Sequence, residues 1–298
     1  MKYKEIDPEL MGIARNVPYN RAVIVCANVF LPIALALTGT PPGISARSIM
    51  VPGHKGLKFR TEVFEPSGAA DSLPSLIYVH GGAFSYKASP HHKKLACIYA
   101  LRANCRVYFP DYHLAPRYPY PAAYEDILAL YRYLMAEGRG DIALAGDSAG
   151  GALAASVCNN CGREGLKRPS AQMLIYPLTD ISMGTRSMKE FNDTPLWNSR
   201  NNRRMWGYYC GGPDCRDASP MHMALPGNIP DTYIETAEYD CLRDEGILYG
   251  GKLRKAGARV AINETKGTFH GYDCAINAKI TSVNVEKRIE FLKKCFKS

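Results

Sequence analysis

The sequence predicts an α/β fold with a mostly parallel central sheet and helices on both faces. From residue 75 onward, short apolar runs typical of buried strands alternate with segments of helical periodicity. This alternation is typical of a parallel sheet covered on both sides. The chain has 298 residues, of which 46% are hydrophobic and 22% charged, enough to bury one large core. We therefore expect a single domain over residues 1–298.

The elements follow one another in a regular order. Glycine or proline follows several of the apolar runs, as at a strand end. Ile127, Leu130, Tyr131 and Leu134 stand at helical spacing after two prolines, which favour a helix start. The expected strands are 76–79, 107–109, 142–145, 173–176, 233–236 and 260–262, and the expected helices are 122–135, 151–158, 246–255 and 285–296.

Two segments interrupt this alternation. The first 60 or so residues contain no obvious strand of a parallel sheet, and residues 182–225 are irregular and rich in Arg, Asn and aromatic residues. Long insertions in a compact domain are usually lids or binding loops. We expect one helical cap from about residues 1–50 and 182–225, over the carboxyl ends of the strands, where open α/β sheets bind ligands.

The apolar segment 22–37 is a candidate for membrane contact or export. It has 16 residues and contains Asn28 and Pro32, so it falls short of the ~20 residues that span a bilayer. Ala34-Leu35-Ala36 resembles a signal-peptidase site, but the preceding stretch carries acidic residues, unlike the basic start of a signal peptide. We expect a buried or interfacial helix of the cap, no stable membrane insertion and a cytoplasmic location, with export as the alternative.

Charge and cysteine content narrow the function classes further. The net charge is +9, but the basic residues are scattered and form no dense run, so we expect no nucleic-acid partner. Ten cysteines in a chain of this length are too few for a disulfide scaffold and are expected to be mostly free thiols. Cys158 and Cys161 form a C-x-x-C pair without a second pair, which favours small buried residues over a metal or redox site.

A candidate nucleophile stands in Gly146-Asp147-Ser148-Ala149-Gly150. This G-x-S-x-G pattern follows an expected strand and precedes an expected helix. A nucleophile elbow needs this context, because its serine sits on a sharp turn that requires close backbone approach. An ordinary glycine-rich turn or a phosphate cradle is the alternative, but no G-K-[ST] follows. We expect Ser148 to be the nucleophile.

A nucleophilic serine needs a base and a carboxylate that orients it. His270 follows the last expected strand, late in the chain as the order Ser, acid, His requires. Asp240, after the strand 233–236, is the best candidate for the acid. Asp244 and Glu245 are close rivals, more easily interpreted as the charged first turn of the next helix, and Asp180 is an outside candidate.

Acyl transfer also needs donors for the oxyanion that develops on the substrate. His80-Gly81-Gly82-Ala83-Phe84 directly follows the strand 76–79. Gly81 and Gly82 can turn their N–H groups inward without side-chain interference. With the N–H of Ala149 they would supply three donors.

Five blocks in this order resemble the hormone-sensitive-lipase-like branch of the α/β hydrolases. They are residues 80–84, 111–116, 146–151, 240–246 and 270–271, and the likeness covers about residues 60–298. The resemblance implies an α/β-hydrolase fold with a helical cap and a serine carboxylesterase or deacylase. It also implies Ser148 as nucleophile, His270 as base, Asp240 as acid, and Gly81, Gly82 and Ala149 as oxyanion donors.

The sequence departs from the family pattern in three places. Ala83 replaces the usual third glycine, Arg117 replaces a frequent glutamate after Leu-Ala-Pro, and Cys241 replaces the usual proline after the acid. None of these changes removes a catalytic group.

The sequence-based expectation is a serine esterase that acts on small-molecule esters with short acyl groups, acetyl above all. It needs neither a cofactor nor a metal. Two other functions remain open: a ligand-binding protein on the same scaffold, against which His270 argues, and a transacylase or amidase with the same triad. A homodimer also remains open, and the identity of the alcohol group is not fixed by the sequence.

Overall fold

The computed structural model describes residues 5–211 and 215–296. One sheet of eight strands crosses the molecule in the order β1-β2-β4-β3-β5-β6-β7-β8. β1 and β2 pair antiparallel with each other, β2 pairs antiparallel with β4, and the other neighbours are parallel. The strands are β1 Ile44–Pro52, β2 Lys58–Pro66, β3 Ser75–Val79, β4 Arg106–Pro110, β5 Ile142–Asp147, β6 Ala171–Ile175, β7 Asp231–Tyr239 and β8 Val260–Phe269.

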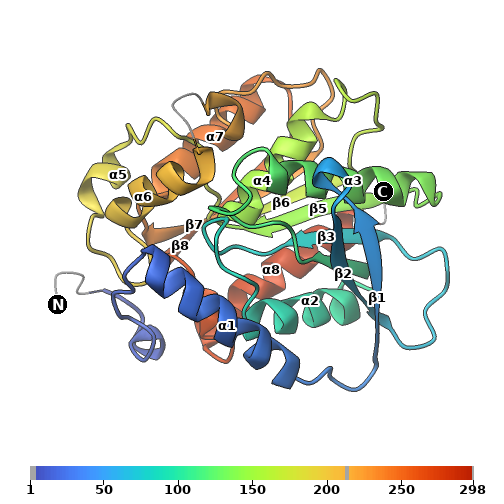
Figure 1. The fold of residues 1–298 in the computed structure, drawn as a ribbon, viewed down its shortest axis with the longest axis horizontal. Coiled ribbons are helices and arrows are strands. Elements are labelled where there is room, and N and C mark those ends of the chain that lie inside the picture. The colour runs from blue at the N-terminus through green and yellow to red at the C-terminus, as the bar shows by residue number, and fades with distance from the viewer. Residues whose placement is uncertain (1–4, 212–214, 297–298) are drawn as a thin grey trace.

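Helices cover both faces of this sheet (Figure 1). α2 and α8 pack on one face, where Tyr99 and Ile289 share a core with Leu76 and Tyr78 of β3. α3, α4 and α7 pack on the other face, against the alternate residues of β3 such as Ile77. The helices are α1 Arg21–Leu37, α2 Pro90–Arg102, α3 Ala122–Ala136, α4 Ala149–Asn160, α5 Arg186–Glu190, α6 Ser199–Cys210, α7 Arg243–Lys255 and α8 Lys279–Cys295.

The predicted fold class is confirmed, because each expected strand and helix coincides with an observed one. Sequence reasoning missed α2 and the two antiparallel strands β1 and β2. β1 exposes most of its residues, so it lacks the apolar run that marks a buried strand. The cap was expected to include residues up to about 50, and this boundary is wrong, since Ile44–Pro52 forms the edge strand of the sheet.

The two segments outside the predicted alternation contact each other. Asn201 of α6 donates a hydrogen bond to the Val17 carbonyl, 3.0 Å away. The Leu196 N–H donates to the Arg15 carbonyl at 2.9 Å, and the rings of Tyr19 and Trp197 meet edge to face with centroids 5.3 Å apart. Residues before α1 are thus joined to the α5–α6 region.

Of the two expectations for segment 22–37, a buried or an interfacial helix, the structure excludes the buried one. Only Ile24 of the 17 residues of α1 is buried. Within the described residues, no helix is both long enough and apolar enough to cross a membrane.

The cysteines are mostly free thiols, as expected. Eight are free, and Cys158 and Cys161 are both buried among them. The exception is a disulfide between Cys210 and Cys215, whose Cα atoms are 5.5 Å apart.

Candidate active site

Ser148 occupies a tight turn between β5 and α4. Its φ is +54°, a left-handed value that non-glycine residues rarely adopt. The turn requires the glycines beside it. A Cβ on Gly150 would lie 2.0 Å from the Val79 carbonyl oxygen, and one on Gly146 would lie 2.3 Å from backbone atoms of Gly150. β5, α4 and β3 can therefore approach closely enough to hold Ser148 at the carboxyl edge of the sheet.

The structure brings Ser148, His270 and Asp240 into one hydrogen-bonded chain. Ser148 Oγ lies 2.9 Å from His270 Nε2, and His270 Nδ1 lies 2.8 Å from Asp240 Oδ2. All three side chains are buried, and Asp240 is fully so. They come from the ends of three strands, β5, β7 and β8, which lie side by side with β6 in the sheet.

Asp240 is held in place by its own backbone neighbourhood. Its second carboxylate oxygen, Oδ1, accepts a hydrogen bond of 2.9 Å from the Leu242 N–H. With Oδ2 directed at His270, both oxygens have a donor. The carboxylate therefore fixes His270 with its Nδ1 protonated and its Nε2 free to accept the serine proton.

The three rival carboxylates have other partners. Asp244 accepts hydrogen bonds from the Ser187 N–H and from Arg243. Asp180 contacts His222 and Ser182. Glu245 accepts from the Thr179 and Asp180 N–H groups, and burial raises its pKa well above the ordinary value.

In the loop after β3, one of the expected oxyanion donors already has an acceptor. The Gly81 N–H donates to Asp147 Oδ2 at 3.0 Å, so it is not free in this structure. The N–H groups of Gly82, Ala83 and Ala149 have no acceptor in the part of the chain that the structure describes. Gly82 and Ala83 both have positive φ values, +121° and +55°, and both line the same cavity as Ser148.

The Asp147 carboxylate accepts hydrogen bonds from several segments, and sequence reasoning did not single it out. Besides the Gly81 N–H, this carboxylate accepts hydrogen bonds from the Tyr78 hydroxyl at 3.1 Å and from His92 Nε2 at 3.2 Å. Burial alone would raise the pKa of Asp147, but the nearby histidines, His92 foremost, hold it below the ordinary value. The only sequence signal was the place of Asp147 beside the serine, and His92 gave none.

A cavity of about 340 Å³ opens above Ser148. Its polar side holds Ser148, His270 and His92, and its apolar side is formed by large side chains from distant segments of the chain. The Trp197 ring lies 6.2 Å from the His270 ring, and the Tyr176 ring 4.7 Å from it. Val17, Leu31, Tyr86, Tyr176, Leu196 and Trp197 line the apolar side.

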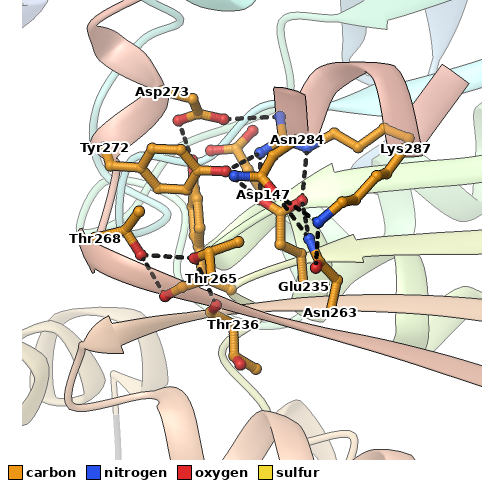
Figure 2. A network of polar contacts seen from close by, with 12 residues as sticks. Asp147, Glu235, Thr236, Asn263, Thr265, Thr268, Tyr272, Asp273, Asn284 and Lys287 are labelled. Carbon is orange, nitrogen blue, oxygen red and sulfur yellow. Dashed lines mark hydrogen bonds and ion pairs between the residues drawn. The ribbon is translucent and has the colours of Figure 1, made fainter. Parts of the chain in front are cut away.

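Tyr176, which lines the cavity, joins a polar network that includes Glu235, Tyr272 and Asp273 (Figure 2). The Tyr176 hydroxyl donates to Asp273 at 2.5 Å, and Arg288 of α8 pairs with Asp273 and with Glu235. Tyr272 also donates to Glu235, at 2.8 Å. The network fixes the Tyr176 ring against His270. Among the described residues no group of His, Cys, Asp and Glu is arranged to hold a metal ion.

Comparison with known proteins identifies the family. The model of a family with the α/β-hydrolase fold matches residues 76–273. The chain belongs to this family. This confirms the resemblance to its hormone-sensitive-lipase-like branch.

Two relatives and one solved structure are similar to this α/β hydrolase over most of its length. Esterase LipI of Mycobacterium tuberculosis is 32% identical over 283 residues, which cover 90% of this chain and 88% of LipI. An acetyl-hydrolase of Streptomyces hygroscopicus is 31% identical over 265 residues, 86% of this chain and 81% of the relative. The solved structure of a bacterial heroin esterase superposes with a TM-score of 0.90 and 29% identity, and covers 100% of both chains.

The stability of this α/β hydrolase should depend on pH through His80. This side chain is fully buried, and its Nε2 has no partner among the described residues. Burial, together with the neighbouring His92, lowers its pKa to about 4. An unfolded histidine titrates near about 6.5. Between these values the unfolded chain binds a proton that the folded chain does not, so stability decreases as pH falls from about 6.5 to about 4.

Urea unfolding of the wild type and of His80→Asn over this pH range measures the effect. The variant removes one such group. The slope of its unfolding free energy against pH should be smaller by up to about 1.4 kcal/mol per pH unit. Equal slopes would contradict the account.

Proposed function

We propose that this chain hydrolyses small carboxylic esters with short acyl groups, acetyl above all, through a Ser148-His270-Asp240 triad. The chain is a carboxylic ester hydrolase, as its family and its esterase relatives indicate. The finer proposal rests on one observation, the continuous hydrogen-bonded chain from Ser148 Oγ through His270 to Asp240.

Acylation follows from the roles of these groups. His270 Nε2 takes the Ser148 hydroxyl proton as Oγ attacks the ester carbonyl. The carbonyl oxygen becomes an oxyanion, for which we propose the N–H groups of Gly82, Ala83 and Ala149 as donors. Asp240 accepts the Nδ1–H bond throughout and stabilises the imidazolium. When the C–O bond to the alcohol breaks, the imidazolium returns its proton to the departing alkoxide, which leaves as the alcohol.

Deacylation repeats these steps with water. His270 takes a proton from the water molecule that attacks the acyl carbon, and the hydroxide oxygen forms the new bond. The imidazolium then protonates Ser148 Oγ as the acyl–serine bond breaks. The carboxylic acid leaves, and the enzyme is restored without any cofactor.

The preference for short acyl groups is supported by the walls of the cavity. Its volume is about 340 Å³, near the lower end of the range for ligand pockets. Trp197, which is 8% exposed, stands beside His270 and limits the room for an acyl chain. The relative from Streptomyces hygroscopicus is named an acetyl-hydrolase.

We further propose that the N-terminal segment through the end of α1 and residues 182–225 act together as a cap. Val17 and Leu31 from the first segment and Leu196 and Trp197 from the second line the same cavity. Substrate size is then set by the cap, while the triad comes from the sheet. We treat residues 5–296 as one domain with this cap.

Ser148→Ala tests the nucleophile. The variant should lose about 10⁶ of kcat on p-nitrophenyl acetate, the size seen when a nucleophilic serine is removed. It should keep the wild-type melting temperature, because the Ser148 side chain contributes little packing. Hydrolysis at more than a hundredth of the wild-type rate by a folded, clean preparation would overturn the proposal.

Asp240→Asn tests the acid of the triad. Loss of the correct histidine tautomer should lower kcat by about 10⁴. Asp244→Asn and Asp180→Asn are matched controls, whose carboxylates contact Ser187 and His222 instead, and both should stay within about tenfold of wild type. The measurement is steady-state kcat of the folded variants, which identifies the carboxylate that supports catalysis. A loss of thousands-fold in either control, with near-normal turnover in Asp240→Asn, would show that the acid is wrong.

Trp197→Leu tests the acyl specificity. The smaller side chain should raise the ratio of kcat/KM for p-nitrophenyl octanoate to that for the acetate by about tenfold or more. Trp206→Leu is the control, since the other tryptophan of the chain packs on Phe84 and Tyr209. An unchanged ratio in Trp197→Leu would mean that this ring does not limit the acyl group.

A further inference from the structure

α1 exposes an unbroken apolar stripe. Five of the eleven large hydrophobic side chains that are exposed in residues 5–211 and 215–296 belong to this one helix, with exposed fractions from 54% to 83%. Figure 1 shows α1 at the surface, on the outer side of α2. The exposed apolar positions recur at helical spacing along one side. We call them the α1 stripe: Ala22, Val25, Cys26, Val29, Phe30, Ile33, Ala36 and Leu37.

The orientation of α1 is fixed by its opposite side. Asn28 donates a hydrogen bond to the Ser85 carbonyl at 2.8 Å and accepts one from the Lys87 N–H at 2.9 Å. Ile24 is buried against the body. A surface helix normally turns its apolar side to the core and its polar side to water. α1 turns an apolar side to water as well as to the body, and the two Asn28 bonds hold it in this orientation.

Basic residues line the hollows alongside the α1 stripe. A groove of about 760 Å³ runs between α1 and the segment 111–118, and a second hollow of about 410 Å³ continues toward the end of the helix. Their acidic residues, Asp111 and Glu62, pair with Lys87 and Arg60. The other cations have no acidic partner among the described residues. The cations lining the two hollows are Arg21, Lys58, Arg60, Lys87, Lys93 and Arg117.

We propose that α1 docks on an anionic membrane surface. The α1 stripe enters the boundary between headgroups and acyl chains, and the cations beside it contact lipid phosphates, as in interfacial amphipathic helices. The helix has 17 residues and is about 25 Å long, which suits a helix that lies flat. A second copy fits less well, because a two-fold contact through this face would place the same unpaired cations close to one another.

Docking would set the catalytic cavity beside the membrane. Leu31, on the same helix, lines the cavity that contains Ser148. The proposal concerns binding alone and does not depend on the proposed chemistry, so its test uses no substrate.

Vesicle flotation of the full chain tests the proposal. Vesicles of phosphatidylcholine with about one third phosphatidylglycerol should carry the protein upward at about 0.1 M salt. They should carry much less at about 1 M, where the Debye length falls from ~10 to ~3 Å. Pure phosphatidylcholine vesicles should bind at least about tenfold less protein.

Variants distinguish binding through the α1 stripe from nonspecific binding to vesicles. The double variant Val29→Asp/Ile33→Asp should bind anionic vesicles at least about tenfold more weakly, because charges replace the inserted side chains. Leu248→Asp, at another exposed leucine on α7, should bind like wild type. Lys58→Glu/Arg117→Glu should also weaken binding. Melting temperatures near the wild-type value establish that the variants are folded, as expected for exposed positions.

Two results would overturn the proposal. One is equal vesicle binding by wild type and by Val29→Asp/Ile33→Asp. The other is no vesicle binding by the wild type. If, in addition, sedimentation velocity finds that the wild type is a dimer and the double variant a monomer, a second copy of the chain covers the α1 stripe.

Discussion

The site depends on the Asp147 carboxylate. It joins three parts of the fold: Tyr78 on β3, the Gly81 N–H in the loop after β3, and His92 on α2. Because Asp147 directly precedes Ser148, these bonds connect the turn that holds Ser148 to the loop after β3. The bond to Gly81 occupies that amide, whereas the N–H groups of Gly82 and Ala83 have no acceptor among the described residues. The charge of Asp147 is supported by His92, whose ring is itself positioned by the Ser89 N–H.

The sequence predicts which residues form the site better than it predicts the contacts that hold them in place. The pattern of strand, G-D-S-A-G and helix requires close packing of Gly146 and Gly150 against the backbone, and the structure has this packing. The chain order of serine, acid and histidine placed Ser148, Asp240 and His270 at neighbouring strand ends, and they do form hydrogen bonds to one another. Local patterns of this kind carry their own geometric demands, so they can be interpreted without a structure.

The features that sequence reasoning missed depend on contacts between distant segments. Gly81 and Gly82 are equivalent as letters, and only the carboxylate of Asp147 distinguishes their amides. His92 lies in a helix without a strong apolar pattern, so nothing marked it as a partner of Asp147. β1 is an exposed edge strand without an apolar run. For α1, the apolar segment was evident, but its outward orientation follows from hydrogen bonds of Asn28 to residues 85 and 87.

The central claim is that Ser148 forms the covalent intermediate. The most direct measurement is titration of the wild-type protein with a diethyl aryl phosphate, followed by peptide mapping in a mass spectrometer. The account predicts one phosphoryl group per chain, attached to Ser148, with hydrolytic activity lost in proportion to the label. Full labelling of Ser148 with activity retained, or inactivation with the label on another residue, would contradict it.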